Sequence, residues 1–148
     1  MHKVSNITYN NRTLSKHYRY SQTVNDPVKL FGIQNKKINI SIWQRKLDNA
    51  LQKAAEEILS NNPDFRLTIV PRLQDIKEVL SSELGSNQNN SYLIEDISKI
   101  ANMFCNFFDL KRAWIRLDAI KKPMCPRFHA DKVKCRLVTT YAGPATEW

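Results

Sequence analysis

The stretch LIEDISKIANMFCNFFDLKRAWIRLDAI, residues 93–120, decides the fold class because its hydrophobic period changes partway along it. Over Leu93–Phe108, apolar side chains recur every three or four residues, which predicts an amphipathic helix with a core-facing stripe. After Lys111 the period becomes two, so Ile115 and Leu117 fall on one side of a predicted strand. The other side of that strand carries Trp114, Arg116 and Asp118. A helix followed at once by a two-faced strand indicates a fold that mixes helices with sheet.

Two more helices and one more strand are predicted upstream of this stretch. The segment SIWQRKLDNALQKAAEEILSNNP, residues 41–63, has a helical apolar stripe, with Ser41 and Gln44 as a capping box at its start. RLTIV, residues 66–70, contains β-branched residues and ends before a proline, which predicts a short strand. The apolar spacing over residues 73–80 then predicts a shorter helix.

The remaining predicted elements complete the fold class. The polar stretch SSELGSNQNNS, residues 81–91, predicts a loop between two helices. Two further strands are predicted downstream, RFHAD at 127–131 and CRLVTTYA at 135–142, because β-branched and aromatic residues favour the pleated state. With helices first and strands last, the predicted class is α+β, with N-terminal helices packed on a partial antiparallel β-sheet.

Composition favours one folded domain behind a polar arm. The 148 residues are 42% hydrophobic, which is enough to build a core. Residues 1–37 lack sustained apolar periodicity, so we expect a flexible basic arm there and a single α+β domain over 38–148. No apolar run approaches the roughly 18 residues of a membrane span, and no signal peptide is evident, so we expect a cytoplasmic protein without membrane association.

The net charge of +9 is unevenly distributed. Residues 1–46 hold nine basic and one acidic residue, residues 47–110 hold five and ten, and residues 111–148 hold nine and three. Basic ends around an acidic body permit attraction to nucleic acid or to small anions. No helix-turn-helix, zinc-finger or RNP-like pattern accompanies the charge, so we do not expect specific nucleic-acid binding.

The candidate chemistry gathers near the C-terminus. In an extended RFHAD segment, His129 and Asp131 lie on the same side about 7 Å apart, where imidazole and carboxylate can bind one ion. Non-haem Fe(II) oxygenases use two histidines and one carboxylate in this way. The second histidine has no convincing source, since His2 and His17 lie in the predicted arm. An ordinary reading is a hydrogen-bonded surface histidine beside a surface aspartate.

The cysteines suggest two alternatives to an Fe(II) site. Three cysteines without a secretory signal favour reduced thiols or metal ligands over disulfides. Cys125 and Cys135 can join His129 and Asp131 as ligands of Zn²⁺, although the spacing is that of no common zinc module. A nucleophilic cysteine activated by nearby basic residues is the weaker alternative, because no oxyanion-hole pattern accompanies it. Cys105, on an apolar helix face, is expected to be a small buried hydrophobe.

These residues carry a resemblance to a known family. Residues 38–148 resemble an uncharacterised bacterial family, domain of unknown function 1826, whose pattern is Met-Cys-Pro-Arg-Phe-His-x-Asp-x-Val followed by Arg-Leu-Val-x-Thr-Tyr-x-Gly-Pro-Gly-Thr-Glu-Trp. Ala145 departs from this pattern, which has glycine there, and a positive φ at that position would strain alanine. The matching residues are Cys125, Pro126, Arg127, Phe128, His129, Asp131, Val133, Arg136, Leu137, Tyr141, Gly143, Pro144, Thr146, Glu147 and Trp148.

The resemblance implies a metal-related role. The family is associated with zinc limitation, and its His-x-Asp motif is similar to that of Fe(II)/2-oxoglutarate oxygenases of jelly-roll fold. His129 and Asp131 would then bind Fe(II), and Arg127 or Arg136 would attract an anionic cosubstrate. Family members continue past Thr-Glu-Trp, so we expect a truncated copy with an incomplete jelly roll that is inactive by itself. Its open sheet edges favour a homodimer. The alternative is a non-enzymatic zinc-binding protein of metal homeostasis.

Overall fold

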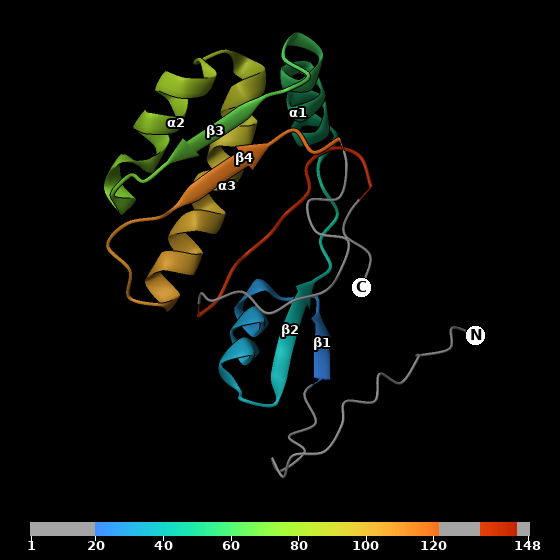
Figure 1. The fold of residues 1–148 in the computed structure, drawn as a ribbon, viewed down its shortest axis with the longest axis vertical. Helices are drawn as coiled ribbons and strands as arrows, with labels where there is room; N and C mark the ends of the chain where they lie inside the picture. The colour runs from blue at the N-terminus through green and yellow to red at the C-terminus, as the bar shows by residue number, and fades with distance from the viewer. Residues whose placement is uncertain (1–19, 122–133, 145–148) are drawn as a thin grey trace, which may run out of the picture. The chain divides into compact units, whose positions relative to one another are not determined.

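The computed structural model describes residues 20–121 and 134–144 (Figure 1). It divides into two compact units, residues 1–45 and residues 46–148. The elements are, in chain order, β1 (Tyr20–Val24), η1 (Pro27–Gln34), β2 (Ile38–Trp43), α1 (Asn49–Asn61), β3 (Arg66–Ile69), η2 (Leu73–Asp75), α2 (Ile76–Leu84), α3 (Gln88–Phe107) and β4 (Ile115–Asp118). This mixture of helices and small sheets confirms the α+β class.

The first unit is a parallel strand pair with a helical crossover. β1 and β2 pair in parallel, and η1 connects them. Asp26 caps η1 by accepting a hydrogen bond from the Val28 N–H at 2.9 Å. The Gln22 side chain donates to the Ser41 hydroxyl at 2.8 Å and so links the two strands. None of residues 20–45 is buried, so this unit has no core of its own among the described residues.

The second unit is built on an antiparallel ribbon of β3 and β4. Its register pairs Ile69 with Ile115 and Leu67 with Leu117, on the side that joins the helices. The ladder continues past the strands to an isolated bridge between Arg72 and Arg112. The sequence prediction of a strand over 66–70 and a two-faced strand after Lys111 is therefore confirmed.

Three helices cover the apolar side of this ribbon (Figure 1). α1 begins after Asp48, whose carboxylate accepts from the Ala50 N–H at 3.0 Å. α2 ends at Gly85, where φ is +81°, a conformation that glycine adopts without strain. α3 begins after Asn87, whose side chain accepts from the Asn90 N–H at 2.7 Å.

A buried asparagine fixes the turn between α2 and α3. Asn90 is only 5% exposed, and its side-chain amide donates to the Leu84 carbonyl at the end of α2. A second contact reaches the Gly85 carbonyl at 3.4 Å. The amide thus satisfies helix-end carbonyls that would otherwise lack a partner. The two helices are therefore joined by three residues, 85–87, rather than by the longer loop predicted over 81–91.

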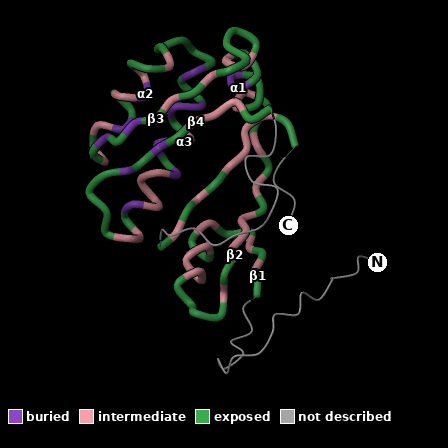
Figure 2. The backbone as a smooth tube through the Cα atoms, in the orientation of Figure 1, coloured by how far each residue is buried: buried purple, intermediate pink, exposed green. Residues whose placement is uncertain are grey.

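The core of this unit is one apolar cluster (Figure 2). It combines both strands with all three helices, and its fully buried members include Ile76 and Leu80 of α2 and Cys105 of α3. The Cys105 sulfur lies 3.7 Å from the Arg112 carbonyl oxygen. Cys105 is thus a buried core residue, as the sequence predicted. The apolar stripe of α3 is likewise confirmed as core.

The predicted start of the first helix is wrong. Residues 38–43 form β2, and the capping box at Ser41 does not exist, because Ser41 lies within that strand. Alternating isoleucines make this stretch period-two, and the cap is Asp48, seven residues later. Residues 20–37, predicted as part of an arm, contain β1 and η1. Residues 1–19 lie outside the described part of the chain.

The predicted C-terminal strands have different outcomes. Residues 135–142 form no strand in the structure. Their β propensity alone does not define a strand, because a strand needs a partner for its backbone groups. RFHAD lies outside the described residues, and jelly-roll character is not seen in the two-stranded sheets of the described ranges. Within those ranges, no helix has the length and apolarity needed to cross a membrane.

Candidate functional site

The structure describes only part of the predicted site. Cys125, Arg127, His129 and Asp131 lie outside the described residues, whereas Cys135 and Arg136 lie inside them. In the described ranges, no three metal-ligating side chains gather closely enough to hold an ion. Arg136 is exposed. Of the predicted metal ligands, the structure therefore describes the surroundings of Cys135.

Cys135 is a free, half-buried thiol. Burial raises the pKa of this thiol, and a hydrogen bond from the backbone N–H of Arg136 lowers it by a smaller amount. Burial also raises the pKa of Cys105. Because only the thiolate is nucleophilic, a raised pKa leaves both sulfurs weakly reactive at neutral pH. This environment does not support the hypothesis of an activated cysteine at residue 135.

The rate of alkylation measures the reactivity of these two thiols directly. We expect Cys135 and Cys105 to react with iodoacetamide more slowly than free cysteine at neutral pH, since a raised pKa lowers the thiolate fraction. Reaction should accelerate as the pH rises through and beyond the ordinary thiol pKa. Peptide mapping by mass spectrometry gives the rate at each residue. Faster labelling of Cys135 than of free cysteine would restore the nucleophile hypothesis.

A tyrosine of the C-terminal motif attaches its segment to α3. The Tyr141 hydroxyl donates to Asp96 Oδ2 at 2.7 Å, and its ring packs against the apolar cluster. Gly143 follows with φ of +78° and open space around its α-carbon, so it permits a turn that other residues adopt poorly. The sequence placed Tyr141 in a strand and in the motif, but gave no signal of its partner on α3.

The hydrogen bond between Tyr141 and Asp96 should contribute measurably to the free energy of unfolding. We expect Tyr141→Phe to lower the free energy of unfolding by about 1–2 kcal/mol, because a hydrogen bond to a carboxylate is lost. Urea denaturation followed by circular dichroism measures the change. Tyr92→Phe is the matched control, since Tyr92 is 48% exposed on the same helix. Equal effects of the two substitutions would show that the Asp96 contact does not stabilise the fold.

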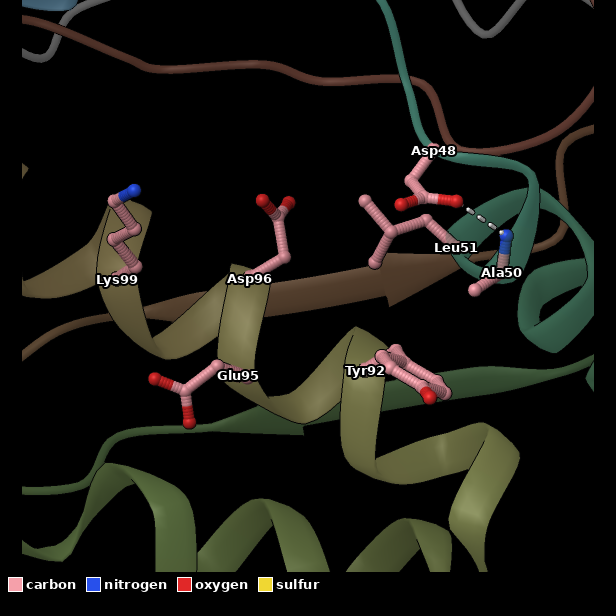
Figure 3. A pocket seen from close by; sticks show the side chains of 7 residues that line it. All are labelled: Asp48, Ala50, Leu51, Tyr92, Glu95, Asp96 and Lys99. Carbon is pink, nitrogen blue, oxygen red and sulfur yellow. Dashed lines mark hydrogen bonds between the residues drawn. The ribbon is translucent and has the colours of Figure 1, made fainter.

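A shallow hollow of about 240 Å³ lies beside this contact (Figure 3). Its rim is acidic, but its carboxylates already have partners: Asp48 caps α1, Asp96 accepts from Tyr141, and Glu95 pairs with Lys77 at 2.5 Å. In Figure 3 Glu95 points away from Asp96, so the two do not converge on one point. These three carboxylates are therefore engaged in contacts within the fold. It is lined by Asp48, Ala50, Leu51, Tyr92, Glu95, Asp96 and Lys99.

The fold and the motif together define an α+β protein whose C-terminal segment is attached to α3 through Tyr141. The chain matches the family model described as "Protein of unknown function (DUF1826)" over residues 24–148, and it belongs to that family. The match confirms the predicted family and extends it upstream of residue 38. No curated protein and no solved structure matches the chain.

Proposed function

We propose that this protein binds zinc through Cys125, His129, Asp131 and Cys135. Two thiolates, an imidazole and a carboxylate are a donor set that suits a tetrahedral Zn²⁺ ion. All four residues fall within an eleven-residue stretch of the sequence, residues 125–135. The proposal places the protein in metal binding or metal homeostasis, and in the reducing cytoplasm, where thiols remain free.

The environment of Cys135 is the observation that supports this proposal. Its sulfur is half-buried, unpaired with another cysteine, and held by the backbone N–H of Arg136. Hydrogen bonds from backbone amides orient metal-bound sulfur and tune its affinity. Zinc binds the thiolate, so binding at Cys135 has to displace the thiol proton and should release a proton to solution.

An Fe(II) site of the oxygenase kind is the second candidate. It uses His129 and Asp131 as two of three ligands and a neighbouring arginine, Arg127 or Arg136, for an anionic cosubstrate such as 2-oxoglutarate. The His-x-Asp spacing supports it, because a strand would place both side chains on one face. This candidate has no role for the cysteines, which makes the two proposals separable.

Equilibrium zinc titration distinguishes them. We expect the chain to bind one Zn²⁺ with loss of at least tenfold in affinity in Cys135→Ser, since a thiolate is removed from the ligand set. Cys105→Ala is the matched control, because this buried cysteine belongs to the core and not to the proposed site. If Cys125→Ser and Cys135→Ser both bind zinc like the parent chain, the zinc proposal is wrong. Retained Fe(II) binding that depends on His129 and Asp131 would then favour the oxygenase candidate.

A further inference from the structure

The side of the β3–β4 ribbon that faces away from the helices is basic and aromatic. The ladder pairs Arg66 with Asp118 and Thr68 with Arg116, and its extension pairs Arg72 with Arg112. Side chains alternate along a strand, so these residues share the side opposite Ile69 and Ile115. Trp114 lies between Arg112 and Arg116 on that same side. We call this surface the arginine–tryptophan face; it comprises Arg66, Arg72, Arg112, Arg116, Trp114 and Val70.

The burial pattern agrees with this assignment without exception. Along 66–72 and 112–116, every residue of the face is exposed, whereas the alternate residues are half-buried or buried. Trp114 is 75% exposed and Val70 is 53% exposed. Tryptophan is ordinarily well buried, and an exposed one beside another apolar residue indicates a contact surface.

Two of the four arginines make contacts along the ribbon. Arg112 Nη1 donates to the Val70 carbonyl oxygen at 3.2 Å, which keeps the guanidinium of Arg112 on the ribbon. Arg116 Nε lies 2.6 Å from Asp118 Oδ2. Asp118 is the one carboxylate among the ladder positions of this side, from 66 to 72 and from 112 to 118. Four guanidinium groups and one carboxylate leave this side with a net charge of +3, concentrated on a short ribbon.

We propose that the arginine–tryptophan face binds single-stranded nucleic acid without sequence specificity. Exposed aromatic rings stack on bases, and arginines beside them contact the phosphates of the same strand. Arg112 and Arg116 lie about 13 Å apart along one strand, and Arg66 and Arg72 about 20 Å apart along the other, so their donors follow the ribbon as an extended polyanion requires. The inference is independent of the zinc proposal, because it uses none of the proposed metal ligands.

The same charges disfavour the other occupants of an exposed sheet side. A second copy docked through the same face would bring four arginines against four arginines, which is repulsive. Insertion into a lipid surface needs a broad apolar side, whereas only Trp114 and Val70 are apolar here. Binding of a second copy and binding to a lipid surface would each give a different result in the experiment below.

The test is fluorescence anisotropy of the full chain with a labelled oligothymidylate of about 20 nucleotides. We expect salt-dependent binding, about tenfold weaker in Trp114→Ala and largely retained in Trp114→Phe. We expect the double substitution Arg66→Gln with Arg72→Gln to lower the slope of log affinity against log salt by about 1.4. Lys53→Gln with Lys99→Gln, at exposed positions of α1 and α3, removes the same charge elsewhere and should leave affinity within twofold of the parent.

Several results would overturn the proposal. They are an absence of oligonucleotide binding, equal losses from the arginine and lysine pairs, and binding to anionic phospholipid vesicles alone. Dissociation of a dimer by Trp114→Ala in sedimentation would show that a second copy covers the face. A second measurement keeps Trp114 in place, so it does not depend on the folding of a Trp114 variant. In a chain carrying Trp43→Phe and Trp148→Phe, the oligonucleotide should quench the fluorescence of Trp114, the one remaining tryptophan. Unchanged emission in that protein would also refute the proposal.

Discussion

Replacement of Leu80 by alanine should lower the free energy of unfolding of the second unit by about 3 kcal/mol. Leu80 is fully buried on α2, in the cluster that joins the helices to the β3–β4 ribbon. Truncation removes buried methyl groups and leaves a cavity that neighbouring helices fill only partly. Chemical denaturation of parent and variant, followed by circular dichroism, measures the difference.

Leu110→Ala is the control for this truncation. Leu110 is 41% exposed, so the same change of side chain removes little buried surface, and a loss below about 1 kcal/mol is expected. Similar losses at both positions would contradict the packing described for α2. They would mean that Leu80 is not in the core around which the helices assemble.

Zinc should stabilise the folded protein strongly. A ligand that binds only the native state, at about a thousandfold its dissociation constant, raises the free energy of unfolding by about 4 kcal/mol. We therefore expect a large upward shift of the unfolding midpoint in zinc and its reversal by a chelator. The measurement is thermal or urea unfolding across a zinc concentration series.

The same series in Cys135→Ser and His129→Ala should show most of the stabilisation lost. Both residues are proposed ligands, and each removed ligand weakens the binding that stabilises the native state. Cys105→Ala should keep the full zinc-dependent increase, although its basal stability is lower because a buried side chain is shortened. A zinc effect that is equal in all variants would indicate binding elsewhere.

The sequence predicted α3, β3 and β4 of the second unit well, because their periodicity is set by burial. The stripe of α3 and the alternation around Ile115 both reflect one apolar cluster, so the pattern and the packing coincide. The start of α1 was predicted incorrectly because Trp43, which lies in β2, also fits the apolar spacing of the helix that follows. Five residues separate β2 from the helix, which begins where the Asp48 carboxylate accepts from the Ala50 N–H.

The candidate site was less predictable, for a physical reason. Motif spacing indicates which side chains are close along the chain, and it gives no information about distant partners. The contact between Tyr141 and Asp96 joins residues forty-five positions apart, and no local pattern encodes it. The strand predicted over 135–142 was wrong, since these residues form no strand, and Tyr141 instead packs its ring against the apolar cluster.

The arginine–tryptophan face shows what sequence and structure contribute together. The alternation of Trp114 and Arg116 with Ile115 was evident in the sequence as a two-faced strand. Only the register with β3 shows that Arg66 and Arg72 belong to the same side. The surface is therefore a product of strand pairing, which a single sequence does not specify.

The most direct test of the zinc proposal is the absorption spectrum of the chain loaded with Co²⁺ in place of zinc. A tetrahedral site with two thiolates should give strong visible ligand-field bands and sulfur-to-cobalt charge transfer in the near ultraviolet, at one Co²⁺ per chain. Both features should be lost in a chain carrying Cys125→Ser and Cys135→Ser. A weak, octahedral spectrum without charge transfer in the parent chain would contradict the assignment of these cysteines as metal ligands.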